Sequence, residues 1–181
     1  MRKTDVGRQW WMVAIVLIGG LSVWADSSPT RHTLAQGLVS LELPASWKLQ
    51  QEALTPPDIA VIENEDGSIR IKLGLQPVPG TAFSEVVAAV EGAFASNFQD
   101  FQKIASATET IAGQEVFWIE STLKDSGSAW HAVAYFTKTK DEQLFSLSFR
   151  TQPGDIKRLR PQFDQFVKSV EVEGRHLVAS K

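Results

Sequence analysis

Side chains able to act as nucleophiles, bases or metal ligands are few in this sequence. It contains no cysteine and only three histidines, His32, His131 and His176. No Gly-x-Ser-x-Gly elbow occurs either, so the usual activated serine and cysteine nucleophiles are both missing. His32 and His176 lie near the chain ends, where a rigid surround is hard to build, and His131 lies in an expected strand. The sequence therefore predicts a protein that is not an enzyme and has no catalytic residue.

Metal and cofactor sites are not expected either. Zinc needs several converging ligands, which one well-placed histidine cannot supply. The run Asn64-Glu65-Asp66-Gly67 resembles the start of a calcium loop, but the twelve-residue loop with its closing glutamate is missing. We interpret the run as a turn.

A pair of tryptophans indicates a binding surface instead. Strand-like runs at 114–123, 129–138 and 143–151 are expected to pair through short turns. With simple hairpin registers, the core face would carry Phe117, Ile119, Val133, Tyr135, Phe145, Leu147 and Phe149. The other face would carry Trp118, Glu120, Trp130, Ala132, Ala134, Ser146 and Ser148.

Trp118, Glu120 and Trp130 are therefore the predicted binding surface, because aromatic rings over small residues can line a groove. Alternatively, a helix packs on the small residues and covers both tryptophans. A slip of one residue would exchange the two faces. In the expected register His131 lies on the core face and Glu120 lies on the other face of the sheet, so the two would not form a catalytic pair.

The remaining elements follow from apolar periodicity. Residues 69–75 alternate as a strand, and Asp66-Gly67 predicts a hairpin that pairs 59–64 with 68–75. Residues 38–43 also alternate. Apolar residues three and four apart predict a helix at about 82–97 with Thr81 as its N-cap, and a second helix carrying Ile156 to Val170. Pro161 is expected in the first turn of that helix or at a kink.

The N-terminus has the pattern of an export signal. Arg2, Lys3 and Arg8 precede an apolar run, Trp10 to Val23, and Val23 and Ala25 fit the −3 and −1 positions of a cleavage site. We expect cleavage after Ala25 and a periplasmic or secreted protein. An uncleaved anchor is the alternative, but a membrane helix needs about 20 apolar residues.

The expected domain organisation follows from this leader. Residues 1–25 are a signal peptide, 26–35 a flexible lead-in, 36–173 one domain and 174–181 a flexible tail. Cleavage would leave 15 basic and 20 acidic residues, a net charge of −5. Such an acidic surface argues against nucleic-acid binding, and no stable membrane span is expected after cleavage.

The order of elements resembles the PsbP-like superfamily, which includes the bacterial DcrB-like envelope proteins. The likeness is carried by Leu43-Pro44-Ala45-Ser46-Trp47-Lys48, by Ile-Ala-Gly at 111–113 and by the closing Phe166-Val167-Lys168-Ser169-Val170. It implies an α+β fold, an antiparallel sheet flanked by helices in an α/β/α sandwich. It implies no chemistry, since such proteins serve mainly as accessory or assembly factors. Many bacterial relatives are lipoproteins, whereas this chain lacks the cysteine that carries the lipid.

Three functions remain open. The first is a non-catalytic module of the bacterial envelope that binds another envelope protein. The second is a carrier that holds a small apolar or lipid-like ligand between sheet and helix. The third is an enzyme that uses His131 with Glu120 in an unrecognised site.

Overall fold

The computed structural model describes residues 28–179, and the leader with its expected cleavage point lies outside these residues. Within them, neither helix is long and apolar enough to cross a bilayer. The chain order is β1 (Thr30–Leu34), the 3₁₀ turn η2 (Ala35–Gly37), β2 (Val39–Leu43), β3 (Lys48–Gln50), β4 (Asp58–Glu63), β5 (Arg70–Pro77), α1 (Phe83–Asn97), β6 (Gln99–Ile111), β7 (Gln114–Asp125), β8 (Ser128–Lys138), β9 (Gln143–Thr151), α2 (Ile156–Ser169), β10 (Glu171–Val172) and β11 (Arg175–His176).

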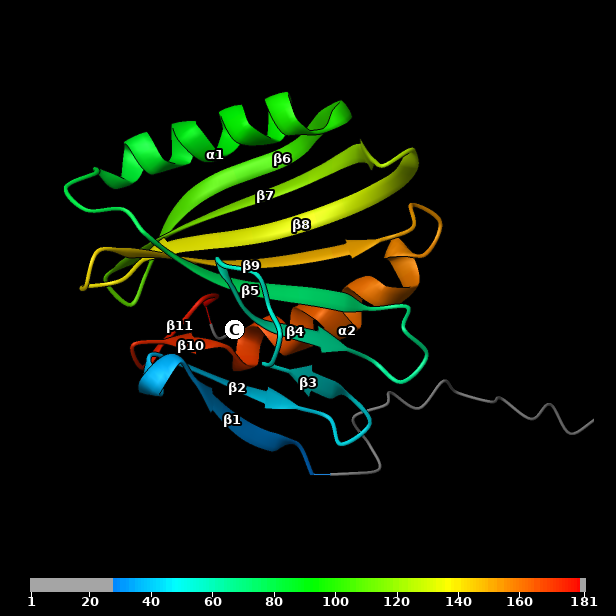
Figure 1. Cartoon of the computed structure of the whole chain (residues 1–181), viewed down its shortest axis with the longest axis horizontal. Helices are drawn as coiled ribbons and strands as arrows, with labels where there is room; N and C mark the ends of the chain where they lie inside the picture. Colours follow the sequence, from blue (N-terminus) through cyan, green and yellow to red (C-terminus); the bar gives the residue numbers. More distant parts are fainter. Residues whose placement is uncertain (1–27, 180–181) are drawn as a thin grey trace, which may run out of the picture.

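A seven-stranded antiparallel sheet forms the middle layer, in the order β3-β4-β5-β9-β8-β7-β6. Helix α1 lies on one face, over β6 and β7, and α2 lies on the other (Figure 1). A four-stranded sheet, β1-β2-β10-β11, lies on the α2 side. The fold is therefore α+β, with helices on both faces of an antiparallel sheet.

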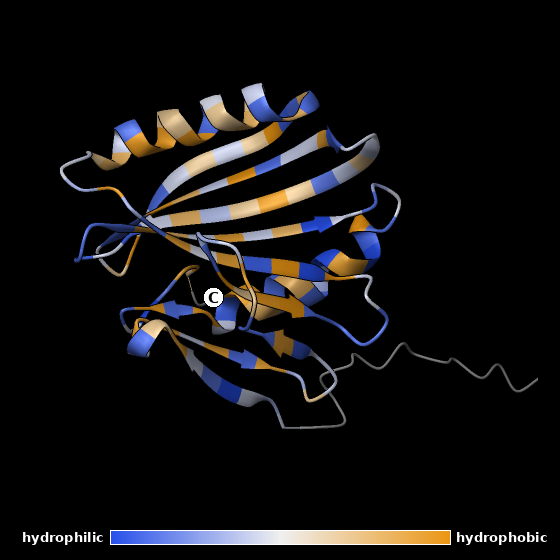
Figure 2. Ribbon diagram, in the orientation of Figure 1, coloured by the Kyte–Doolittle hydropathy of each residue, from blue (hydrophilic) through white to orange (hydrophobic). Residues whose placement is uncertain are grey.

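Two apolar cores hold the layers together, and the apolar stripes of the helices turn toward the sheet (Figure 2). Under α1, Phe83 and Val86 pack with Phe117 and Phe136 of the sheet. Under α2, the Phe163 ring stacks on Phe149 with centroids 4.6 Å apart, inside a larger core that extends to the small sheet. Burial of these aromatic rings supplies much of the stabilisation available to a chain without disulfides.

The register of β7 corrects the predicted faces. Asp125 pairs with Ser128 across a two-residue turn, so odd positions of β7 lie beside even positions of β8. Phe117 is opposite Phe136 and faces α1, whereas Trp118 is opposite Tyr135 and faces α2. The predicted register of β7 is therefore wrong by one residue, and Phe117 and Ile119 do not share a face with the core residues of β8 and β9. The side chains of β8 and β9 that were predicted to share the core face do share it. They are Val133, Tyr135, Phe145, Leu147 and Phe149.

The predicted hairpin at 59–64 and 68–75 is confirmed, with Ile62 opposite Ile71. The N-cap of α1 is Ala82 rather than Thr81, and Glu85 accepts a hydrogen bond from the Ala82 amide at 3.2 Å. Pro161 is the sixth residue of α2, so its placement in the first turn is wrong.

The ends of the domain are more ordered than predicted. The lead-in at 26–35 includes β1, which pairs along its whole length with β2. The tail from 174 includes β11, and Leu177 is fully buried. Val172 of β10 lies opposite Val39 of β2, so both ends of the domain meet in the small sheet. A short, mostly polar strand such as β1 lacks the apolar alternation by which strands are recognised.

Candidate functional site

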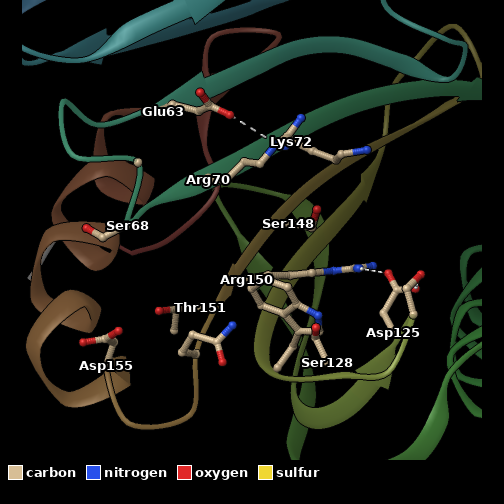
Figure 3. A pocket seen from close by; sticks show the side chains of 14 residues that line it. Glu63, Ser68, Arg70, Lys72, Asp125, Ser128, Ser148, Arg150, Thr151 and Asp155 are labelled. Atoms are coloured by element: carbon tan, nitrogen blue, oxygen red, sulfur yellow. Dashed lines mark hydrogen bonds and ion pairs between the residues drawn. The ribbon is translucent and has the colours of Figure 1, made fainter.

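An open groove of about 810 Å³ lies on the α1 side of the large sheet, beyond the part that the helix covers (Figure 3). Its floor is formed by neighbouring strands, because Lys72 of β5 pairs with Ser148 of β9, and Ser148 pairs with Ala134 of β8. The volume is in the range of small-molecule sites, about 300–1,000 Å³. The lining residues are Glu63, Gly67, Ser68, Arg70, Lys72, Asp125, Ser126, Ser128, Trp130, Ser148, Arg150, Thr151, Gln152 and Asp155.

Charged side chains of the groove are mostly paired with one another. Arg150 donates to Asp125 at 2.8 Å and Arg70 lies 3.4 Å from Glu63 (Figure 3). Lys72 donates to Asp58, just outside the lining, at 2.9 Å. The lining holds three acidic and three basic residues. The groove therefore offers both donors and acceptors without a large excess of either charge.

One aromatic ring lines this groove, and a second contacts one of its arginines. Trp130, on β8, is half-buried and lines it. The Arg150 guanidinium lies over the Phe98 ring, 4.8 Å from its centroid, where α1 ends. Because such a cation–π contact helps to fix the arginine, its direction toward Asp125 is set before any ligand arrives.

The turn between β4 and β5 forms one rim. Asp66 accepts hydrogen bonds from the Ser68 amide at 2.9 Å and the Ser68 hydroxyl at 2.6 Å, and Asn64 accepts one from the Ile69 amide at 2.7 Å. These bonds to Ser68 lower the pKa of Asp66 below its ordinary value. Gly67 has φ 68°, as the predicted turn requires. Among residues 28–179, no group of three or more potential ligands is placed to hold a metal ion.

The predicted surface of Trp118, Glu120 and Trp130 does not form one face. Trp118 and Glu120 face α2, and Trp130 faces the α1 side. Trp118 packs against the larger core and donates from Nε1 to Glu109 Oε1 at 2.9 Å. The structure thus separates the two tryptophans by the thickness of the sheet.

Glu120 and His131, expected on opposite faces, are in contact. His131 Nε2 lies 2.7 Å from Glu120 Oε1, because the β7 register puts both side chains on the α2 side. Arg160 of α2 donates to Glu120 Oε2 at 2.7 Å and to Asp164 at 2.7 Å. Burial alone would raise the pKa of Glu120, but the bonds from Arg160 and His131 outweigh burial and lower it.

This cluster ties α2 to the sheet. Both oxygens of Glu120 are engaged by partners, and an ionised carboxylate only accepts, so His131 Nε2 must carry the proton. Each oxygen of the carboxylate therefore has one donor, His131 on the sheet or Arg160 on the helix. These charge-assisted hydrogen bonds fix α2 against the sheet.

Strand β6 forms one edge of the large sheet and was missed by the sequence analysis. It is 13 residues long, and Ile104 is 54% exposed. Register shifts occur around Gln102 and Lys103, after which Ala105–Ile111 pair regularly with β7. The predicted Ile-Ala-Gly opening at 111–113 is the turn between these strands. An exposed edge lacks the apolar alternation of a half-buried strand, which explains the omission.

Trp130 and Ser148 of the groove were predicted on one face, but its charged residues were missed, although the sequence holds a signal for them. Arg70 and Lys72 alternate with the apolar residues of a predicted strand, and Arg150 continues the Ser146, Ser148 series. Each run marks a polar face. Only the strand order β5-β9-β8 places these faces side by side.

Comparison with known proteins supports the architecture. No protein-family model matches the chain, and no curated protein sequence matches it. Among solved structures, cyanobacterial PsbP (CyanoP) from Synechocystis sp. PCC 6803 superposes with a TM-score of 0.65 at 14% identity, over 86% of this chain and 98% of that one. LpqN of Mycobacterium tuberculosis, involved in cell envelope biogenesis, gives 0.57 at 14% identity over 81% and 85%. The Pseudomonas aeruginosa protein PA94, of unknown function, gives 0.52 at 14% identity over 77% and 93%. The chain has a PsbP-like fold, as the resemblance predicted, while the nearer likeness to DcrB-like proteins stays a prediction.

Proposed function

We propose that this chain, whose fold is PsbP-like, is an exported, non-catalytic accessory module of the bacterial envelope that binds another envelope protein. The partner adds an extended segment to the edge of the large sheet at β6. The leader pattern in residues 1–25 supports export. The fold shared with LpqN and CyanoP is compatible with an accessory role.

The observation that carries the proposal is the regular stretch Ala105–Ile111 at the sheet edge. Among the described residues, no strand pairs with its outer side. Unpaired backbone amides and carbonyls on such an edge are a template for an extended peptide. Seven residues span about 24 Å, enough for a stable ladder.

The turn after β6 defines which residues point outward. Ala112 and Gly113 have φ of 49° and 75°, as a two-residue hairpin turn requires, and Ile111 pairs with Gln114. The pair that flanks such a turn is hydrogen-bonded, and bonding alternates from there. Ser106, Thr108 and Thr110 therefore present their N–H and C=O groups to the outside.

Trp118 is the side chain that we expect to anchor the partner beside this edge. It lies opposite Ala107 on the adjoining strand, and Glu109 of β6 fixes its indole. Tryptophan is the residue type most often found at the energetic centre of interfaces. In this proposal the predicted roles of Trp118 and Trp130 are separate, because they lie on different faces.

The alternative of an apolar ligand carried between sheet and helix has less support. The spaces between the layers are occupied by side chains such as Phe149, Phe163 and Phe117. A catalytic role for His131 with Glu120 also has less support, since the carboxylate is bound by two partners.

Proline substitution at neighbouring positions tests the proposal. Thr108→Pro removes an outward N–H and should leave the sheet intact, because proline is tolerated on edge strands. Ala107→Pro removes a bond to β7 and should destabilise the fold. A photocrosslinking residue at Thr110 should capture an envelope protein in exporting cells, and Thr108→Pro should abolish that product.

A crosslinker at Glu52, exposed and distant in the sheet order, is the matched control. Products that are identical at positions 52 and 110, or a Thr110 product that persists in the folded Thr108→Pro protein, would contradict the proposal.

A further inference from the structure

We propose that the groove beside Trp130 is a binding site for a neutral saccharide. This site is separate from the β6 edge and faces the other side of the sheet from Trp118. It goes beyond the proposed protein-binding role, and its failure would leave that role untouched.

The first observation is that the cations of the groove have partners within the protein. Arg150 is held by Asp125 and by the Phe98 ring, Arg70 lies beside Glu63, and Lys72 is paired with a carboxylate as well. An anionic ligand would have to displace these carboxylates or lie beside them. Charge complementarity therefore favours a ligand without net charge.

The second observation is the mixture of hydrogen-bonding groups. A sugar hydroxyl both donates and accepts, so it is best matched where carboxylates and guanidinium groups alternate. The floor and rim hold both kinds of group: Glu63 lies opposite Arg70, and Arg70 lies opposite Arg150, whose guanidinium is paired with Asp125. The hydroxyls of Ser128 and Ser148 lie on the same side of the sheet (Figure 3).

The third observation is Trp130 itself, which lines an otherwise polar groove. The C–H faces of a sugar ring pack on an indole, while its hydroxyls remain at the ring edge for the polar groups. A purely polar anion site has no use for such a ring. An apolar ligand, conversely, would remove water from the charged groups of the lining without replacing its hydrogen bonds, which costs free energy.

The fourth observation is that the lining is fixed before binding. Ser68 is held by three hydrogen bonds with Asp66 and Asn64, and the arginine directions are set by ion pairs. Preorganised polar groups lower the cost of ordering on binding.

The test uses purified protein labelled with 5-fluorotryptophan and observed by fluorine NMR. The probes are maltotriose and triacetylchitotriose, with inorganic phosphate and a hexaglutamate peptide as anionic comparisons. We expect at least one trisaccharide to shift the Trp130 resonance with saturation and to leave that of Trp118 unchanged. Affinity should not change between about 50 and 500 mM salt, because a neutral ligand makes no screened contact.

Variants make the assignment specific. Trp130→Ala should weaken trisaccharide binding by about tenfold or more, measured by calorimetry because this variant lacks the reporting indole. Trp118→Ala, on the other face, should change it by less than about twofold. Should Trp130→Ala fail to fold, Ser128→Gln at the exposed rim serves instead, because the longer side chain narrows the groove. A response to phosphate or hexaglutamate alone, no response to any probe, or equal binding by the folded Trp130→Ala protein would overturn the inference.

Discussion

Replacement of Glu120 by glutamine gives a quantitative test of the cluster that joins α2 to the sheet. Glu120 accepts hydrogen bonds from His131 and Arg160, each at 2.7 Å, and its side chain is 19% exposed. Glutamine keeps the shape but loses the charge and turns one acceptor into a donor. A hydrogen bond to a charged group contributes about 1.5–3 kcal/mol and a neutral one about 0.5–1.5 kcal/mol, so two weakened bonds amount to about 2 kcal/mol.

Partial exposure lowers this value. The Arg160 side chain is 30% exposed, and solvent weakens ion pairs near the surface. We therefore expect Glu120→Gln to reduce the free energy of unfolding by about 1–2 kcal/mol at neutral pH. The assay is urea denaturation followed by tryptophan fluorescence. Glu63→Gln is the matched control, because its pair with Arg70 is longer and more exposed, and it should cost less than about 0.5 kcal/mol.

The pH dependence of this difference has a defined sign. The pKa of Glu120 is lower in the folded protein than its ordinary value, so the folded state favours the ionised form. The resulting stabilisation is present in full above the ordinary pKa of about 4.3 and is lost as the pH falls through the folded pKa. The gap between wild type and Glu120→Gln should accordingly shrink in acid. Equal losses for the Glu120 and Glu63 variants, or a gap that persists at low pH, would refute the reasoning.

Three further predictions concern the core, the sheet edge and the leader. Phe163→Ala should cost about 3–5 kcal/mol in urea denaturation, because a fully buried ring stacked on Phe149 leaves a cavity, and a loss below about 1 kcal/mol would contradict the packing. Ala107→Pro should lower the melting temperature much more than Thr108→Pro, whereas the reverse order would show that the outward positions of β6 are assigned incorrectly. Sequencing of the exported protein should give an N-terminus at Asp26; an intact Met1 form in the cytosol would contradict export.

The sequence predicts those elements best whose burial is asymmetric. The strand at 69–75 and the helix after Pro79 have one apolar and one polar side, and both form where expected. Strand β6 is exposed over most of its length, and β1 is mostly polar, so neither has a period to recognise. Apolar periodicity in the sequence indicates which residues are buried. Strands β6 and β1 form for a different reason, because a neighbouring strand supplies backbone hydrogen bonds.

The prediction that Trp118, Glu120 and Trp130 share one face depended on the length of the turn between β7 and β8. The sequence Asp125-Ser126-Gly127-Ser128 permits a loop of two or three residues, and that choice decides the faces of the whole of β7. Ser126 and Gly127 have φ of 51° and 82°, which corresponds to a two-residue turn of the hairpin type. With the longer loop, Trp118 and Trp130 would share a face and Glu120 would not meet His131.

Separation of the two tryptophans leads to a prediction that joins both proposals. The groove lies on the α1 side of the sheet, whereas Trp118 lies on the α2 side, beside an edge strand that is separated from β9 by β8 and β7. Sites that share no residues and lie in different layers contribute independently. A saturating trisaccharide should therefore leave the Thr110 crosslink unchanged, and Trp130→Ala should not reduce it. If the sugar abolishes the crosslink while Trp118→Ala leaves it intact, the partner occupies the groove rather than the edge, and the assignment of the two surfaces must be exchanged.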